Sequence, residues 1–129
     1  MKTKTEQILE LTAPYNNSYQ GSYHRALFVC SAGLLRSATA ASVGSCLGMN
    51  TRSCGSETYA LIPLSANLIH WADTIYFVNE YNFHSAKETF FGTEGLGQML
   101  DRKSVIWDIE DDFCYADPKL QQIVLEKLT

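Results

Sequence analysis

The feature that most constrains this chain is a cysteine at the end of a short apolar run, with an arginine six residues later. Residues 26–29 are apolar and lead directly into Cys30, and Arg36 is followed by the small-residue stretch 37–43. This order predicts a strand, a loop and a helix. A loop that opens a helix presents backbone N–H groups without intrahelical partners, and successive N–H groups form a nest for an anion.

The residue types in this loop favour a phosphate site. The field of such a nest stabilises the thiolate, which is the nucleophilic form of cysteine. The guanidinium of Arg36 has the shape to hold two phosphate oxygens at once. Ser37 is placed to cap the helix or to hydrogen-bond the sulfur. A buried structural cysteine with a surface arginine is the alternative interpretation, but Gly33 within the loop favours the phosphate site.

Composition predicts one ordinary globular domain. The chain has 129 residues, of which 46% are hydrophobic and 19% charged, and its net charge is −4. A predominantly basic, nucleic-acid-binding face is therefore not expected. No apolar stretch reaches the length of a membrane span, and Lys2 and Lys4 are followed by Glu6 and Glu10 rather than by the apolar core of a signal peptide. We expect a cytoplasmic protein without nucleic-acid or membrane partners.

The cysteines and histidines indicate neither a metal site nor a disulfide framework. The four cysteines, at positions 30, 46, 54 and 114, lack paired C-x-x-C spacing, and the three histidines are scattered. Paired spacing is what zinc sites and small disulfide-rich folds require. We therefore expect free thiols, no metal and no cofactor.

Strand and helix patterns alternate along the chain. Strands are predicted at 25–30, 51–54, 74–78 and 104–108, and helices at about 35–47, 63–72, 82–91 and 117–128, with a glycine-marked loop at 92–97. This alternation predicts an α/β fold, a four-stranded parallel sheet with helices on both faces. Residues 1–24, with a weak helix at 3–12, form an N-terminal helical and loop extension, and residues 25–129 form the domain.

An acidic cluster follows the fourth predicted strand. In open α/β sheets, ligands bind at the carboxyl ends of the strands, where Cys30 also lies. A cysteine that attacks a phosphate monoester needs an acid to protonate the leaving oxygen. Clustered carboxylates raise each other's pKa values, which helps one of them to stay protonated. The alternative interpretation is a solvated acidic loop. The candidate acids are Asp108, Glu110, Asp111, Asp112 and Asp117.

With these segments in place, residues 25–128 resemble the low-molecular-weight protein tyrosine phosphatase family, and most closely its short bacterial and phage branch. The family's loop has valine, cysteine, five residues, arginine and serine, which are Val29 to Ser37 here. Other matching segments are the turn after the second strand, the helix before the third strand, the end of that strand and the acid loop, at 53–56, 63–73, 77–80 and 109–113.

The resemblance implies roles for individual residues. Cys30 is the nucleophile, Arg36 binds the phosphate, Asp111 is the general acid and Phe113 lines the slot for a phenyl ring. Asp117, which is followed by proline, is the alternative acid, although helix capping also explains it. Ser56 supports the loop. The phosphate-binding residues are Ser31, Ala32, Gly33, Leu34, Leu35, Arg36 and Ser37.

The chain also departs from the family pattern. Gly33 stands where the family has an asparagine that braces the loop, and Asp112 replaces the proline after the acid. Ala38 replaces another proline, and Leu35 replaces a second loop cysteine. We expect either a weaker catalyst or a loop that other residues brace, with Ser56 as the candidate.

The resemblance implies a phosphomonoester hydrolase, of protein tyrosine phosphatase type, that acts through a cysteinyl-phosphate intermediate. The expected partners are a phosphorylated protein or a small phosphate ester, and inorganic phosphate or sulfate is the expected ligand. A catalytically weak or inactive phosphate-binding module is the alternative. An arsenate reductase is less favoured because it needs two further downstream cysteines, and Cys114 alone lies late in this chain.

Overall fold

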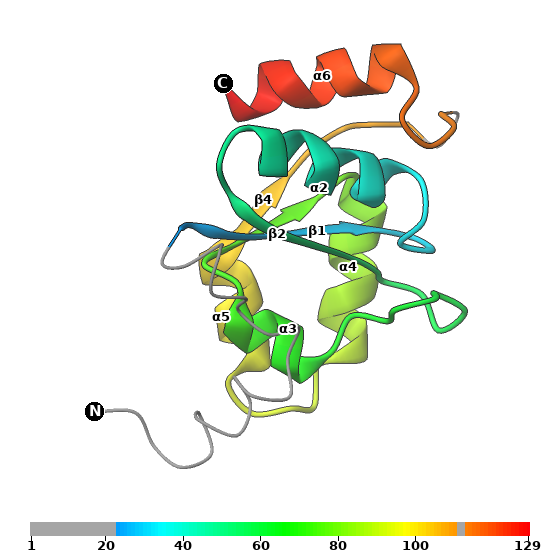
Figure 1. Ribbon diagram of the computed structural model, residues 1–129. Coiled ribbons are helices and arrows are strands. Elements are labelled where there is room, and N and C mark those ends of the chain that lie inside the picture. The colour runs from blue at the N-terminus through cyan, green and yellow to red at the C-terminus, as the bar shows by residue number, and fades with distance from the viewer. Residues whose placement is uncertain (1–22, 111–112) are drawn as a thin grey trace.

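A four-stranded parallel sheet forms the centre of the molecule, with helices on both faces (Figure 1). The computed structural model describes residues 23–110 and 113–129. The strands are β1 (Arg25–Cys30), β2 (Asn50–Gly55), β3 (Thr74–Phe77) and β4 (Ser104–Ile106), in the order β2-β1-β3-β4. The predicted α/β class and parallel sheet are confirmed. The predicted extension, residues 1–24, lies outside the described residues except for its last two.

Helices cover both faces of the sheet (Figure 1). On one side lie α2 (Arg36–Cys46) and α6 (Pro118–Leu128), and on the other lie α3 (Ala66–Trp71), α4 (Glu80–Thr89) and α5 (Leu96–Lys103). Alternate residues of β1 supply both cores. Leu27 and Val29 pack toward α3 and α5, whereas Phe28 and Cys30 pack toward α2 and α6. A strand buried on both faces is apolar throughout, as residues 26–30 are.

The structure corrects one predicted loop and the start of one predicted helix. The predicted loop around Gly95 and Gly97 contains the start of α5, because burial of Leu96 and Leu100 outweighs the low helix propensity of glycine. Pro63 was predicted in the first turn of a helix, but it forms a bridge with Gly55, and α3 begins three residues later behind the cap of Ser65. The remaining elements agree with their predicted ranges to within a few residues.

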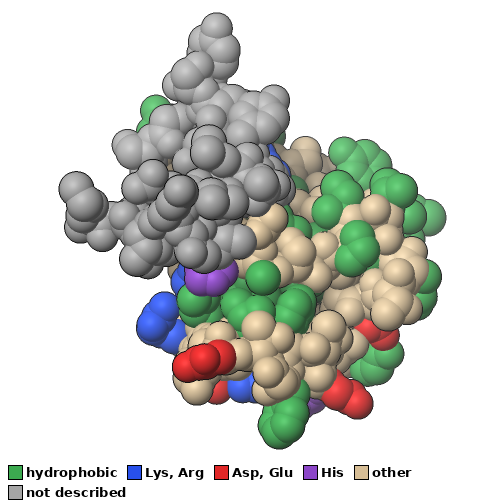
Figure 2. Space-filling view, turned by 90° about the horizontal axis from the view of Figure 1, so that it is seen from below, with side chains coloured by type: hydrophobic (Ala, Val, Ile, Leu, Met, Phe, Trp, Pro, Cys, Tyr) green, Lys and Arg blue, Asp and Glu red, His purple; other side chains and the backbone are tan. Residues whose placement is uncertain are grey.

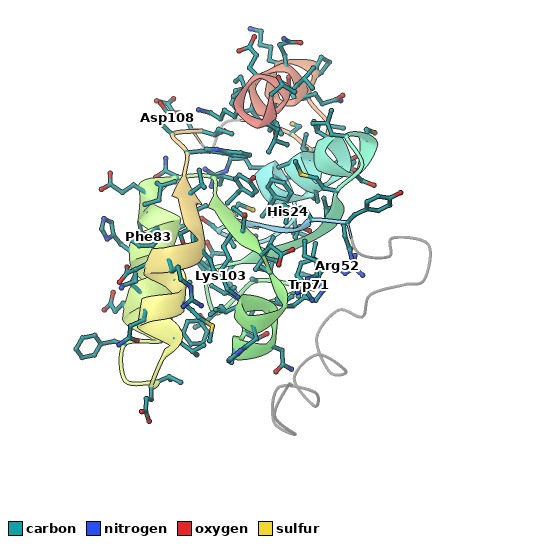
Figure 3. All side chains as sticks on the ribbon, turned by 90° about the vertical axis from the view of Figure 1, so that its left-hand side faces the viewer. His24, Arg52, Trp71, Phe83, Lys103 and Asp108 are labelled. Carbon is teal, nitrogen blue, oxygen red and sulfur yellow. The ribbon has the colours of Figure 1, made fainter. Side chains whose placement is uncertain are left out.

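The amino ends of the strands are closed by polar contacts that lie away from the carboxyl edge. His24 hydrogen-bonds Thr74, and Arg25 pairs with Asp73. Arg52 lies over the ring of Trp71 at 5.4 Å, as the labelled side chains show (Figure 3).

The lower side of the molecule carries few, scattered Lys and Arg side chains in its visible part (Figure 2). No described helix is long and apolar enough to cross a membrane.

Candidate active site

Cys30 lies where three elements of the fold meet. It is the last residue of β1, it pairs in register with Gly55 at the end of β2, and α2 begins at Arg36. The five residues between Cys30 and Arg36 form the loop that we call the phosphate loop, residues 31–35. The predicted strand, loop and helix order is therefore present, and the loop lies at the carboxyl edge of the sheet.

The carbonyl groups at the start of this loop are hydrogen-bonded to the segment that follows β2. The oxygens of residues 30, 31 and 32 accept hydrogen bonds from the amides of Ser56, Glu57 and Leu61, at 2.8, 3.3 and 3.2 Å. The segment 56–61 thus occupies these three carbonyl oxygens. Among the described residues, the loop amides of Ser31, Ala32, Leu34 and Leu35 have no such protein acceptor. Free successive amides are the elements of an anion nest.

The Cys30 sulfur has two hydrogen-bonding partners. The amide of Gly33 donates to Sγ at 3.2 Å, and the hydroxyl of buried Ser37 lies 3.0 Å from it. The residue is 2% exposed, yet it borders a pocket of about 130 Å³. The pocket is lined by Cys30, Ser31, Ala32, Leu35, Arg36 and Tyr59.

Two glycines let the loop lie directly against the end of β2. Gly33 has φ +78°, and a Cβ there would come within 2.8 Å of the Cys54 carbonyl carbon. A Cβ on Gly55 would come within 2.3 Å of the Ser31 carbonyl oxygen. Both distances are too short for real contacts. The absence of a bracing asparagine at position 33 thus has a steric reason, since no side chain fits there.

Arg36 connects the phosphate loop to the segment that follows β4. Its side chain is buried, and Nη1 donates to the carbonyl oxygen of Ile109 at 2.8 Å. The Asn79 amide donates to the same oxygen at 3.4 Å. The predicted acid segment, which begins at residue 109, therefore starts beside the guanidinium.

A side-chain amide that the sequence analysis missed contacts the loop. Asn82 in α4 is fully buried, and its Nδ2 lies 3.1 Å from the hydroxyl oxygens of both Ser31 and Ser56. The Ser56 amide donates to the Cys30 carbonyl, and the Ser56 hydroxyl accepts from Asn82. That Ser56 supports the loop stays a prediction. The sequence contained one indication of the Asn82 contact, because Asn79 and Asn82 follow the carboxyl end of β3.

Comparison with solved structures supports this arrangement at the level of the fold. Wzb from Vibrio vulnificus, solved with benzylphosphonate, superimposes with a TM-score of 0.59 at 14% identity, covering 81% of this chain and 94% of that one. The YwlE arginine phosphatase from Geobacillus stearothermophilus gives 0.57 at 16% identity, covering 81% and 85%. A YwlE mutant from Bacillus subtilis gives 0.55 at 16%, covering 81% and 90%.

This chain has the low-molecular-weight phosphatase fold. The resemblance predicted from the sequence is thus confirmed for the architecture. No family profile matches the sequence, and a search of curated proteins finds no match. Because the identities are low, the roles of individual residues depend on the geometry of this chain itself.

The candidate acids of this phosphatase-fold chain differ in what they contact. Asp111 and Asp112 lie outside the described residues. Asp117 caps α6 by accepting from the Lys119 amide at 2.8 Å. Asp108 is exposed and points outward near α6 (Figure 3), where the hydrogen bond and charge of Lys127 hold the pKa of its carboxyl below the usual value. That direction is opposite to the shift that a general acid needs at neutral pH.

The aromatic side chain at the pocket is not the one that the resemblance indicated. Phe113 is half-buried against the core formed by Trp107 and its neighbours, and it borders a separate pocket that includes Glu110. Tyr59, which is 71% exposed, lines the pocket of Cys30 instead. Tyr59 was missed because it lies in an irregular segment whose position depends on the pairing of β1 with β2.

The second cysteine near the site has a different environment. Cys54 is fully buried in the opposite core, and burial raises the pKa of its thiol, with a smaller effect from the charge of Cys30. All four cysteines are free thiols. Within residues 23–110 and 113–129, no cluster of histidine, cysteine, aspartate or glutamate has the arrangement of a metal site.

Proposed function

We propose that this protein is a phosphomonoester hydrolase of the protein tyrosine phosphatase type, with Cys30 as its nucleophile. The orientation of the loop is the observation that carries the proposal. The carbonyls of residues 30–32 are bonded to the segment 56–61, and the Gly33 amide points at the sulfur. A tetrahedral phosphate is stabilised by amides and a guanidinium, and would be repelled by carbonyl oxygens in the same positions.

The proposed reaction has two steps. The Cys30 thiolate attacks phosphorus, an S–P bond forms, and the P–O bond to the alcohol breaks while Asp111 protonates the leaving oxygen. In the second step Asp111 removes a proton from water, the water oxygen attacks phosphorus, and the S–P bond breaks to release phosphate. Arg36 holds two nonbridging oxygens in both steps, and Ser37 stabilises the departing thiolate through its contact with Sγ.

The proposed substrates are aryl phosphate esters, such as phosphotyrosine in a protein. Among the exposed side chains beside the loop are Leu34, Leu35 and Tyr59, which are 48%, 41% and 71% exposed and carry no charge. An apolar rim favours an aromatic ring over a charged guanidinium. The fold is shared with an arginine phosphatase, so phosphoarginine is the competing substrate.

The test is hydrolysis of p-nitrophenyl phosphate, of a phosphotyrosine peptide and of phosphoarginine by the full chain and by its Cys30→Ser variant. We expect hydrolysis of both aryl esters, loss of detectable activity in Cys30→Ser, and trapping of a phosphorylated Cys30 on rapid acid quench. Absence of hydrolysis with all three substrates overturns the proposal. Faster turnover of phosphoarginine keeps the enzyme class and overturns the substrate.

The low exposure of Cys30 favours one alternative, a phosphate-binding module without turnover. A sulfur that is 2% exposed limits attack on a bulky ester. Binding of inorganic phosphate to the wild-type chain, with no hydrolysis and no trapped intermediate, is the result that this alternative predicts. The same titration with Arg36→Lys identifies the pocket, because loss of the two-oxygen contact weakens phosphate binding there.

A further inference from the structure

Asn82 connects three segments that are far apart in the sequence. Its Nδ2 lies 3.1 Å from Oγ of Ser31, in the phosphate loop, and 3.1 Å from Oγ of Ser56, just after β2. The residue itself belongs to the first turn of α4 and has no exposed surface. The side-chain amide of Asn82 therefore connects the phosphate loop to the segment 56–61.

The start of α4 places this amide beside both halves of the site. Asn79 caps the helix by accepting from the Tyr81 amide at 3.0 Å. Three residues later, Asn82 lies on the same side of the helix. Asn79 donates to the Ile109 carbonyl, the oxygen that also accepts from Arg36. The first turn of α4 thus contacts the phosphate loop through Asn82 and the acid segment through Asn79.

Among the described residues, the Asn82 side chain makes its hydrogen bonds through its amide nitrogen and not through its amide oxygen. Within the described part of the chain, its Oδ1 is buried without a hydrogen-bond partner. A buried acceptor without a partner reduces stability. The Ser56 hydroxyl lies 3.4 Å from a Glu57 carboxylate oxygen and donates toward it, which leaves the Ser56 oxygen as an acceptor for Asn82. The two donated hydrogen bonds are therefore the contacts that Asn82 contributes.

We propose that Asn82 is a positioning residue that holds the phosphate loop in its anion-binding shape through Ser31. The inference rests on the proposed function. Position 33 is a glycine with no space for a side chain, so the loop cannot be braced from within. Asn82 supplies the brace from α4, through the Ser31 hydroxyl. Fixed donors stabilise an oxyanion because they need no reorganisation when it binds.

The experiment compares Asn82→Ala and Ser31→Ala with a matched control, Ala86→Gly, in the full chain. Ala86 is buried in the same helix and has no polar side chain, so its replacement destabilises α4 without changing the contacts to the serines. Three readouts are measured: the pH midpoint of Cys30 alkylation by iodoacetamide, followed by peptide mass spectrometry; the affinity for inorganic phosphate; and kcat with p-nitrophenyl phosphate.

Asn82→Ala is expected to raise the alkylation midpoint of Cys30, to weaken phosphate binding and to lower kcat by about 10–100-fold, since misplaced groups lose rate on that scale. Ser31→Ala is expected to act in the same direction. The double variant should be little worse than Asn82→Ala, because the two side chains form one contact. Ala86→Gly is expected to change the thermal midpoint of unfolding and none of the three readouts.

The proposal is overturned if Asn82→Ala keeps the wild-type alkylation profile and phosphate affinity. Should Asn82→Ala fail to fold, Ser31→Ala decides, since wild-type readouts in that variant overturn the brace equally. Alkylation does not require turnover. A wild-type chain that hydrolyses no ester, with a shifted profile in Asn82→Ala, refutes the proposed function and supports the brace. A wild-type chain that hydrolyses the esters, with an unshifted alkylation profile in Asn82→Ala, supports the proposed function and refutes the brace.

Discussion

Arg36 donates from Nη1 to the backbone oxygen of Ile109, so the group proposed to bind phosphate also anchors the segment that carries the proposed acid. The two residues are 73 positions apart. Arg36 is buried at the start of α2 and Ile109 is buried after β4, so both partners of this hydrogen bond are shielded from solvent. Arg36 therefore connects the start of α2 to the backbone at Ile109, where the predicted acid segment begins.

The first prediction concerns this link. Arg36→Lys keeps a positive charge but loses the planar fork, so it is expected to lower kcat/KM for p-nitrophenyl phosphate by about 10²–10³-fold, the usual effect of removing an oxyanion donor. Steady-state kinetics provide the measurement. Arg102→Lys, at an exposed position in α5, serves as the control. Wild-type kinetics in Arg36→Lys would contradict the role given to the guanidinium.

The second prediction separates the two candidate acids. Asp111→Asn is expected to slow hydrolysis by about 10²–10⁴-fold, whereas Asp117→Asn is expected to leave the rate unchanged. Asparagine caps helices as well as aspartate does, so Asp117→Asn should also keep the thermal stability that depends on the Lys119 contact. The rates of both variants are measured at several pH values. A slow Asp117→Asn variant with a normal Asp111→Asn variant reverses the assignment.

The third prediction concerns Gly33 and uses Gly48 as the control position. Both glycines have positive φ, but nothing lies within 4 Å of a Cβ on Gly48. Gly48→Ala should therefore cost about 1–2 kcal/mol for backbone strain alone. Gly33→Ala should cost more, because its Cβ also meets Cys54, and it should reduce activity. Urea unfolding measures the stability of both variants. Equal losses of stability would show that the contact of the new Cβ with Cys54 adds nothing to the cost.

The same prediction extends to Gly33→Asn, the residue that the phosphatase family has there. Asparagine tolerates the left-handed backbone, but it carries the same Cβ into the Cys54 backbone. We expect Gly33→Asn to lose stability and activity rather than to gain them. An increase in kcat would show that the loop can move away from β2 to admit an internal brace.

The fourth prediction concerns the aromatic wall of the pocket. Tyr59→Ala is expected to raise KM for a phosphotyrosine peptide by about two- to tenfold with little change in kcat, because an aromatic pair contributes about 0.5–1.5 kcal/mol. Tyr59→Phe should keep the wild-type KM. Phe113 borders another pocket, so Phe113→Ala should affect stability more than KM. The opposite outcome, with KM sensitive to Phe113 alone, restores the role that the resemblance gave to that residue.

The fifth prediction concerns Glu57 and acid. Hydrogen bonds from Ser85, and then from Tyr81, lower the pKa of the Glu57 carboxyl below its ordinary value of 4.5. A group whose pKa is lower in the folded state stabilises the fold above its unfolded pKa, and this stabilisation is lost as the pH falls through the folded pKa. The wild-type protein should therefore exceed Glu57→Gln in stability at neutral pH.

The stability difference between wild type and Glu57→Gln should shrink as the pH drops below 4.5. Chemical unfolding at a series of pH values gives this difference directly. Ser42→Ala, on α2 and away from Glu57, is the control. A difference that stays constant with pH would show that Glu57 acts through packing rather than through its charge.

Local patterns were enough to predict much of the fold. The apolar run at 26–29 marks a strand buried on both faces, and Asp117 with Pro118 marks the start of α6. Patterns failed where long-range packing outweighed local preference. The glycines around Leu96 indicated a loop, but the apolar side chains of α5 pack against the core and hold a helix there.

The candidate site was predicted unevenly for the same reason. The positions of Cys30, Arg36 and Ser37 follow from their spacing along one strand, loop and helix. Tyr59 and Asn82 were missed, and Phe113 was assigned to a wall that Tyr59 lines. Their positions depend on which strands are neighbours and on how α4 packs, and neither is written in a short stretch of sequence.

The sequence alone determined most of the elements and the chemistry that one short segment can carry, because dihedral preference and residue spacing act locally. Only the tertiary structure decided which way the loop carbonyls point, that Asn82 reaches Ser31 from 51 residues away, and that Ile109 meets Arg36. These contacts arise where β1, β3 and β4 end at one edge of the sheet. Their geometry is fixed by packing of whole elements, which no local pattern specifies.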